Sequence, residues 1–134
     1  MIYTDFTKKA LKLCFEAHKD QVDKTDMPYV FHPFHLAEQM DDELSTICAL
    51  LHDVVEDTSL TLEDLSERGF PPEAIEALKL LTHDDSVPYM EYVEKIAENP
   101  TAKKVKIADL RHNSDLTRFD FVDEKTRERC KKYQ

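Results

Sequence analysis

Residues 41–58 read DDELSTICALLHDVVEDT, and the fold prediction starts from this stretch. Its acidic opening suits the positive end of a helix, and apolar residues then occur nearly all round from Ile47 to Val55. A helix that is apolar on every side is buried, so the segment predicts one continuous central helix. This core-like helix nevertheless carries four ionisable side chains near its end: His52, Asp53, Glu56 and Asp57.

Helical periodicity extends over most of the remaining chain. Apolar residues recur at three- and four-residue steps, and Thr4, Thr61, Gly69 and the prolines stand where helices begin or end. No strand-type alternation competes with this pattern. We therefore predict an all-α single domain over residues 1–134, with about seven or eight helices. Besides the central segment, helices are predicted at 5–20, 32–40, 61–69, 72–83, 89–99, 101–116 and 122–134.

Composition narrows the function classes. A formal net charge of −10 disfavours a nucleic-acid binder, because such proteins present concentrated Lys and Arg to phosphates. The three cysteines, Cys14, Cys48 and Cys130, have no CxxC spacing, which excludes a disulfide framework and a thiolate zinc site. No apolar run reaches the length of a membrane span, and no secretory signal opens the chain. We expect a cytoplasmic protein with free thiols.

The ionisable side chains of the central helix predict a metal site. Unpaired charge in an apolar helix costs several kcal/mol, and no Arg or Lys lies nearby in the sequence to pair with it. His52 and Asp53 can offer one imidazole and one carboxylate to a divalent ion. Two further candidate ligands are His32, just before Pro33 at a helix start, and Asp109 in an apolar-rich helix. A loop histidine and a hydrogen-bonded carboxylate are the ordinary alternatives, and the joint pattern favours the metal.

The donor set indicates the chemistry. Imidazole and carboxylate without thiolate suit Mn²⁺, Fe²⁺ or Zn²⁺. On a continuous helix Glu56 and Asp57 would lie one turn beyond His52 and Asp53, where they can orient an activated water or take its proton. The prediction is hydrolysis of a phosphoester or pyrophosphate.

Three motifs carry a resemblance to a known family: PYVFHP around His32, LLHDVVEDT around His52 and VKIADLRHN around Asp109. In this order they resemble the HD superfamily of metal-dependent phosphohydrolases, and within it the hydrolase domain of RelA/SpoT homologues, especially the small alarmone hydrolases. The resemblance implies an all-helical HD domain. It also implies removal of the 3′-pyrophosphate from guanosine tetra- or pentaphosphate (ppGpp or pppGpp), which leaves GDP or GTP.

The resemblance also assigns roles to individual residues. It implies one Mn²⁺, held by the positions that match the four candidate ligands, and it makes the acidic pair the group that activates or places water. Asn113 matches a substrate-contacting asparagine. One position departs from the family, where an Arg that stacks on guanine precedes a Lys. Here the pair is Asp23-Lys24, so the Lys is kept for substrate binding and the Arg is absent.

Two alternatives follow from these residues. The Asp23 departure favours the same metal chemistry on another nucleotide or a phosphorylated metabolite. A catalytically silent, metal-binding regulatory module is the second, and Glu56 and Asp57 speak against it because a structural site has no use for them. The remaining polar candidates have ordinary explanations: helix-end hydrogen bonding for His18, packing for Tyr29, and solvation of a polar face for Lys103, Lys104 and Lys106.

Overall fold

The computed structural model describes residues 1–115 and 117, and the helix predicted at 122–134 lies outside them, as does Cys130. The described part is all-helical, as predicted, and its one β-feature is an isolated bridge between Val22 and Pro28. None of its helices has the length and apolar character that crossing a membrane requires. The helices are α1 (Asp5–His18), α2 (Phe31–Glu38), α3 (Glu43–Leu51), α4 (Val54–Asp57), α5 (Leu62–Glu67), α6 (Pro72–Leu81), α7 (Tyr89–Ala97) and α8 (Pro100–Asn113).

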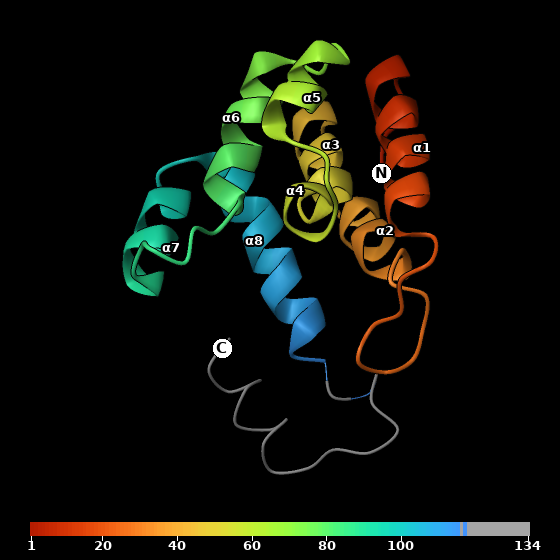
Figure 1. Cartoon of the computed structure of the whole chain (residues 1–134). Helices are drawn as coiled ribbons and strands as arrows, with labels where there is room; N and C mark the ends of the chain where they lie inside the picture. Colours follow the sequence, from red (N-terminus) through yellow and green to blue (C-terminus); the bar gives the residue numbers. More distant parts are fainter. Residues whose placement is uncertain (116, 118–134) are drawn as a thin grey trace.

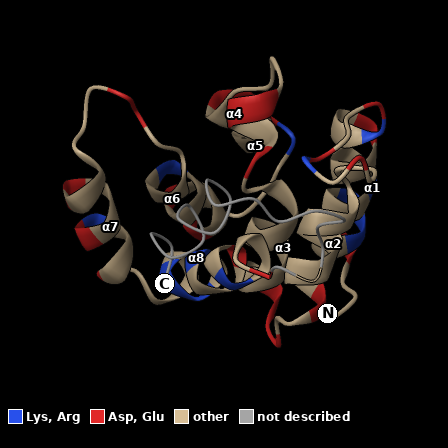
Figure 2. Cartoon of the chain, turned by 90° about the horizontal axis from the view of Figure 1, so that it is seen from below, with Lys and Arg blue, Asp and Glu red and all other residues tan. Residues whose placement is uncertain are grey.

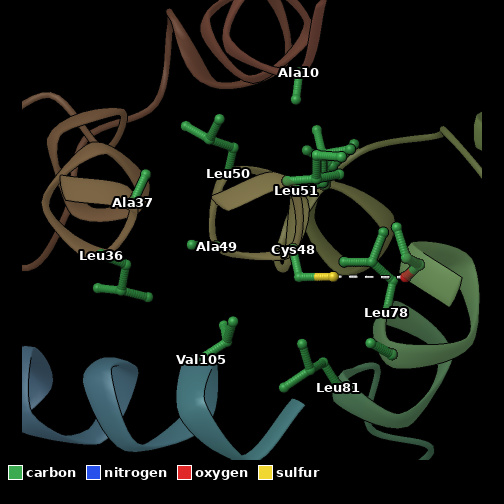
Figure 3. Close-up of a cluster of buried hydrophobic side chains, with 14 of the residues drawn as sticks. Ala10, Leu36, Ala37, Cys48, Ala49, Leu50, Leu51, Leu78, Leu81 and Val105 are labelled. Atoms are coloured by element: carbon green, nitrogen blue, oxygen red, sulfur yellow. Dashed lines mark hydrogen bonds between the residues drawn. The ribbon is translucent and has the colours of Figure 1, made fainter. Parts of the chain in front are cut away.

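The helix α3 is the centre of the fold. It packs against α1, α2, α6 and α8, and Figure 1 shows it between α1 and α2 on one side and α6 on the other. Every residue from Ser45 to Leu51 is buried, which the all-round apolar pattern predicted. Figure 3 shows Cys48, Ala49, Leu50 and Leu51 directed toward different neighbouring helices. Burying α3 on all sides fixes the position of its last turn, from which the polar residues follow.

Local sequence sets the ends of several helices, as predicted. The Thr4 side chain accepts a hydrogen bond from the backbone N–H of Thr7 and starts α1. Thr61 and Asp64 form a reciprocal capping box at the start of α5. Beyond the end of α5, Gly69 has a φ of +90°, a conformation that side-chain-bearing residues rarely adopt.

The predicted continuous helix over residues 41–58 is wrong at its polar end. Helix α3 stops at Leu51, and α4 begins only at Val54. Asp53, between them, has φ −105° and ψ −1°, the bridge region of backbone space, and the i to i−4 bonds resume with Asp57 N–H to the Asp53 carbonyl at 2.9 Å. The acidic turn that follows is therefore not the continuation of a single straight helix, and His52 and Asp53 lie in the turn between α3 and α4.

The two buried cysteines are free thiols, as expected. Cys14 and Cys48 are buried in the core, and the Cys48 thiol donates a 3.6 Å hydrogen bond to the Ala74 carbonyl (Figure 3). Burial raises the pKa of Cys48 to about 12. A thiol that is inaccessible and protonated at neutral pH is a packing residue, so neither of these cysteines is a candidate ligand or nucleophile.

Candidate metal centre

Three candidate ligands from three packed helices converge at one point. His32 lies in the first turn of α2, His52 caps the end of α3, and Asp109 lies one turn before the end of α8. Each offers one donor atom within 4.8 Å of the other two, and all three residues are buried. We call these three residues the donor cluster. Mutual packing of α2, α3 and α8 brings together residues that are up to 77 positions apart.

The orientation of His52 directs one ring nitrogen at two carboxylates. Its Nδ1 lies 2.7 Å from the Ala49 carbonyl oxygen, which can only accept, so Nδ1 carries a hydrogen and, in the neutral ring, Nε2 carries a lone pair. That Nε2 is buried, makes no hydrogen bond of acceptable geometry among the described residues, and lies 2.9 Å from an Asp53 oxygen and 3.6 Å from an Asp109 oxygen. With the ring neutral, three acceptors face one another, so a positive charge must lie between them, either as a proton on Nε2 or as a metal ion.

The raised pKa of His52 also indicates that the site favours a positive charge. Burial acts to lower its pKa, but the carboxylates of Asp53 and Asp109 outweigh burial and raise the pKa of His52 well above the ordinary value. The site therefore favours a positive charge strongly enough to overcome desolvation. A divalent ion supplies that charge without a proton, and two imidazoles with carboxylate suit such an ion, so the residues present fit a metal.

Asp109 is held by four groups in the described structure. Its Oδ1 lies 2.8 Å from His32 Nε2 and accepts a 3.2 Å hydrogen bond from Asn113, while Oδ2 accepts a 3.2 Å bond from Lys106 Nζ. His52 approaches it at 3.6 Å. Burial acts to raise the pKa of Asp109, but the hydrogen bond with His32 and the nearby His52 ring hold it far below the usual range.

Asp53, the fourth predicted ligand, lies beside the donor cluster. One of its oxygens is 2.9 Å from His52 Nε2 and also accepts a hydrogen bond from the Tyr29 hydroxyl. Burial acts to raise the pKa of Asp53, but His52 and Tyr29 together lower it to about 2. The structure thus places an ionised carboxylate next to the cluster, and its role as a ligand stays a prediction.

The acidic pair, Glu56 and Asp57, lies on α4, which follows His52 of the donor cluster in the chain (Figure 2, red). Glu56 Oε1 accepts a 2.6 Å hydrogen bond from the backbone N–H of His83, in the loop between α6 and α7. Burial raises the pKa of Glu56 despite that bond. Burial, followed by the charge of Asp53, also raises the pKa of Asp57. Carboxyl groups with raised pKa values are better proton acceptors than ordinary ones.

The predicted substrate contacts have different surroundings. Lys24 is exposed on the loop before α2, whereas the Asn113 side chain is directed at Asp109. Asp23 Oδ1 accepts hydrogen bonds from Thr25 N–H (2.7 Å), Thr25 Oγ1 (2.5 Å) and Met27 N–H (3.2 Å). The carboxylate of Asp23, at the position where the resemblance implies an arginine, therefore makes hydrogen bonds within the loop.

Sequence reasoning underestimated two residues. Lys106 was assigned to a solvated face, but its side chain is 19% exposed, binds Asp109 and lies 5.5 Å above the Tyr92 ring. The i, i+3 relation to Asp109 was visible in the sequence. Tyr29 was assigned to packing, but its hydroxyl binds Asp53; nothing local in the sequence shows that contact.

His18 is fully buried and tied to the following turn. Its Nδ1 lies 3.1 Å from the Gln21 side-chain oxygen, and its ring centroid lies 4.9 Å from that of Tyr29. The helix-end hydrogen bond predicted for this histidine is therefore present. Together the two contacts hold the loop that leads to α2.

Comparison with known proteins places the chain in a family. No family model matches it. The chain is 30% identical over 136 residues to a guanosine-3′,5′-bis(diphosphate) 3′-pyrophosphohydrolase of Aquifex aeolicus, covering 92% of this chain and 19% of that protein. It is 33% identical over 120 residues to the enzyme of the same name, MESH1, of Mus musculus, covering 78% of this chain and 66% of that protein.

A solved structure supports the same assignment. The structure of a metazoan ortholog of SpoT that hydrolyses ppGpp superposes with a TM-score of 0.75 at 27% identity, covering 99% of this chain and 83% of that one. The chain spans less than a fifth of the first curated relatives that it matches, which include a probable GTP pyrophosphokinase of Mycobacterium leprae. With the three motifs and the donor cluster in place, the chain belongs to the family of RelA/SpoT-type hydrolase domains with an HD-like fold.

Proposed function

We propose that this chain is a metal-dependent pyrophosphohydrolase that removes pyrophosphate from the 3′ position of guanosine 3′,5′-bis(diphosphate). The observation that carries the proposal is the donor cluster, with the buried Nε2 of His52 facing two carboxylates. Two relatives that share about a third of its residues bear the name of this activity. The metal site and the relatives together support the reaction.

The proposed metal is Mn²⁺, with Fe²⁺ and Zn²⁺ as alternatives that suit the same donors. His32, His52 and Asp109 would hold it, with Asp53 as the fourth ligand. When bound, the ion lowers the pKa of water and polarises a phosphate oxygen. The buried walls around these ligands exclude bulk water, which strengthens every charge interaction at the site.

Glu56 and Asp57 are the proposed catalytic residues. Attack of water on phosphorus forms one P–O bond and breaks the bond between phosphorus and the ribose 3′ oxygen. One proton leaves the water, and the 3′ oxygen takes up a proton and leaves as the hydroxyl of GDP. A carboxylate with a raised pKa accepts that proton more readily than an ordinary one, and both residues have raised values. The backbone bond from His83 fixes Glu56, so Glu56 is suited to orienting the water.

Lys24 and Asn113 are the proposed substrate contacts. Lys24 is exposed on the loop between α1 and α2, where its ammonium can meet an incoming phosphate. Asn113 donates to Asp109 Oδ1 and so stands beside the donor cluster. A substrate that contacts Asn113 would have its pyrophosphate close to the ligands.

Incubation of the purified protein with Mn²⁺ and guanosine tetraphosphate tests the proposal. We expect equal amounts of GDP and pyrophosphate, measured by anion-exchange chromatography. The Glu56→Gln variant should lose this activity, whereas Glu63→Gln, which changes an exposed glutamate of α5, should keep it. No release of pyrophosphate, under conditions in which a relative such as the Aquifex enzyme is active, would exclude the substrate.

A second candidate keeps the metal chemistry and changes the substrate to another nucleotide or a phosphorylated metabolite. Asp23 favours it, because its carboxylate is engaged in loop hydrogen bonds and cannot stack on a base as an arginine does. A panel of nucleotides and sugar phosphates, assayed for phosphate and pyrophosphate release, separates the two. Preference for a substrate without guanine would establish the second candidate.

A further inference from the structure

A histidine outside the predicted site contacts one of the proposed ligands. His112, in the last turn of α8, approaches His32 with its Nδ1 2.6 Å from the Nδ1 of His32. The two rings are nearly parallel, at 11°, and their centroids are 4.9 Å apart. Because the nitrogens are much closer than the centroids, the rings meet through their nitrogen-bearing edges. That is the direction in which a ring nitrogen donates or accepts a hydrogen bond.

When a metal is bound, this contact bears on which nitrogen of His32 carries the proton. His32 Nε2 is the atom that faces Asp109, at 2.8 Å, so Nε2 must present a lone pair when a metal is bound. A neutral imidazole then carries its hydrogen on Nδ1. His32 is only 4% exposed, so this N–H needs a partner within the protein, and His112 Nδ1 lies at 2.6 Å, where it can accept the hydrogen.

The two histidines of the donor cluster are oriented by different means. His52 donates its Nδ1–H to a backbone carbonyl, that of Ala49, which no side-chain substitution removes. His32 relies on the side chain of His112, which lies 80 residues away in sequence. Outer partners of metal-bound histidines fix ring orientation and tautomer, and their loss typically lowers metal affinity about 10- to 100-fold.

We propose that His112 is a positioning residue of the metal centre, which accepts the Nδ1–H of His32 and so directs the His32 Nε2 lone pair at the ion. This inference rests on the proposed function, since it needs the donor cluster to bind a metal. His112 touches neither the ion nor the substrate in this role. Its contribution is to affinity for the metal, which can be measured without any turnover.

Titration of Mn²⁺ with the metal-free protein, followed by the electron paramagnetic resonance signal of free Mn²⁺, tests the proposal. In His112→Leu the acceptor is removed, and we expect the dissociation constant to rise about 10- to 100-fold. His112→Asn offers a side-chain oxygen near the position of Nδ1, so it should recover most of the lost affinity. The matched control is His35→Leu, because the His35 ring stacks on His112 at 4.2 Å but is exposed and has no hydrogen bond with a donor of the cluster among the described residues.

The outcomes separate this inference from the proposed function. Equal Mn²⁺ affinity in the unaltered protein and in His112→Leu would overturn the positioning role and leave the metal centre intact. Equal weakening in His112→Leu, His112→Asn and His35→Leu would also overturn it, because the effect would then come from packing. If the unaltered protein binds no Mn²⁺, the metal centre and this inference both fall. Circular dichroism of each variant confirms that affinities are compared between folded proteins.

Discussion

Two pairs of carboxylates at the same end of the molecule differ in their ionisation. The inner pair, Asp53 and Asp109, is more buried, receives hydrogen bonds from histidine, tyrosine, lysine and asparagine side chains, and has lowered pKa values. The outer pair, Glu56 and Asp57, lies on the short helix α4, and burial and neighbouring negative charge raise its pKa values. Donors surround the inner pair, whereas the one hydrogen bond to an outer carboxylate in the described structure is the His83 N–H to Glu56.

This difference in pKa suggests different chemical roles for the two pairs, although all four residues are carboxylates. A carboxylate that stays ionised under all ordinary conditions suits a cation, and one whose pKa is raised suits proton transfer. The two pairs are only a few residues apart in the chain at Asp53 and Glu56, so the surroundings separate them. Substitutions in each pair test whether metal binding and proton transfer are separate functions.

Removal of an inner carboxylate should abolish both metal binding and turnover. In Asp109→Asn the oxygen that faces His32 and His52 loses its charge, so the ion loses the ligand that joins α8 to α2 and α3. Calorimetric titration with Mn²⁺ should show no binding at concentrations that saturate the unaltered protein. Asp85→Asn, at an exposed position in the α6–α7 loop, is the matched control and should bind normally.

Removal of an outer carboxylate should abolish turnover and spare the metal. We expect Glu56→Gln to lower kcat by about 10²- to 10⁴-fold, the usual contribution of a general base. The Mn²⁺ affinity of the same variant, measured by the same titration, should be unchanged. Loss of metal in Glu56→Gln would show that the two pairs are one functional unit and would remove the distinction.

Metal removal should destabilise the fold through the inner pair. An ion present at 100 times its dissociation constant stabilises the native state by about 2.7 kcal/mol. The midpoint of thermal unfolding should therefore fall when a chelator is added to the unaltered protein. The chelator should have no effect on Asp109→Asn, and an equal fall in that variant would mean that the stabilising ion binds elsewhere.

The two lysines of α8 give a smaller contrast. Lys106 is largely buried and binds Asp109, so Lys106→Met should lower the free energy of unfolding by about 1.5–3 kcal/mol, the contribution of a hydrogen bond to a charged group. Lys104 pairs with Asp41 and Asp42 at the exposed surface, so Lys104→Met should leave stability unchanged within error. Urea unfolding measures both. Equal effects would show that Lys106 is an ordinary surface lysine.

The smallest effect concerns pH and the outer pair. The pKa of Asp57 is raised on folding, so the folded state binds more protons than the unfolded state above the ordinary carboxyl pKa. The free energy of unfolding should therefore decrease as the pH rises from the ordinary carboxyl pKa through the raised pKa of Asp57. The variant Asp57→Asn should lack the part of this decrease that comes from Asp57. In the metal-free protein at pH 7 the variant should unfold at a slightly higher temperature. A lower temperature would mean that Asp57 stabilises the fold when ionised.

The parts of this molecule that were predictable depend on local rules. Caps at Thr4 and Thr61, the turn at Gly69 and the burial of α3 follow from neighbouring residues, so the sequence was sufficient for them. The break between α3 and α4 was not predicted, because Asp53 occupies a backbone region that helical periodicity does not specify. Spacing alone therefore joined two helices that the structure separates.

The unpredicted contacts of the site join distant segments. Tyr29 reaches Asp53 across 24 residues, and His112 reaches His32 across 80, so each depends on how α2, α3 and α8 pack. Lys106 is different, because its place one helical turn before Asp109 was available from spacing. The spacing of Lys106 and Asp109 was overlooked because Lys106 was treated together with Lys103 and Lys104 as part of one polar face.

The bond that fixes Glu56 comes from the main chain of the α6–α7 loop, at His83. Among the common amino acids, every one except proline supplies this N–H, so the residue at position 83 can vary widely without removing the bond. The length and path of residues 82–88 matter more, because they determine where the N–H lies. Saturation mutagenesis at this position should therefore retain many active variants, whereas single-residue insertions in the loop should be selected against.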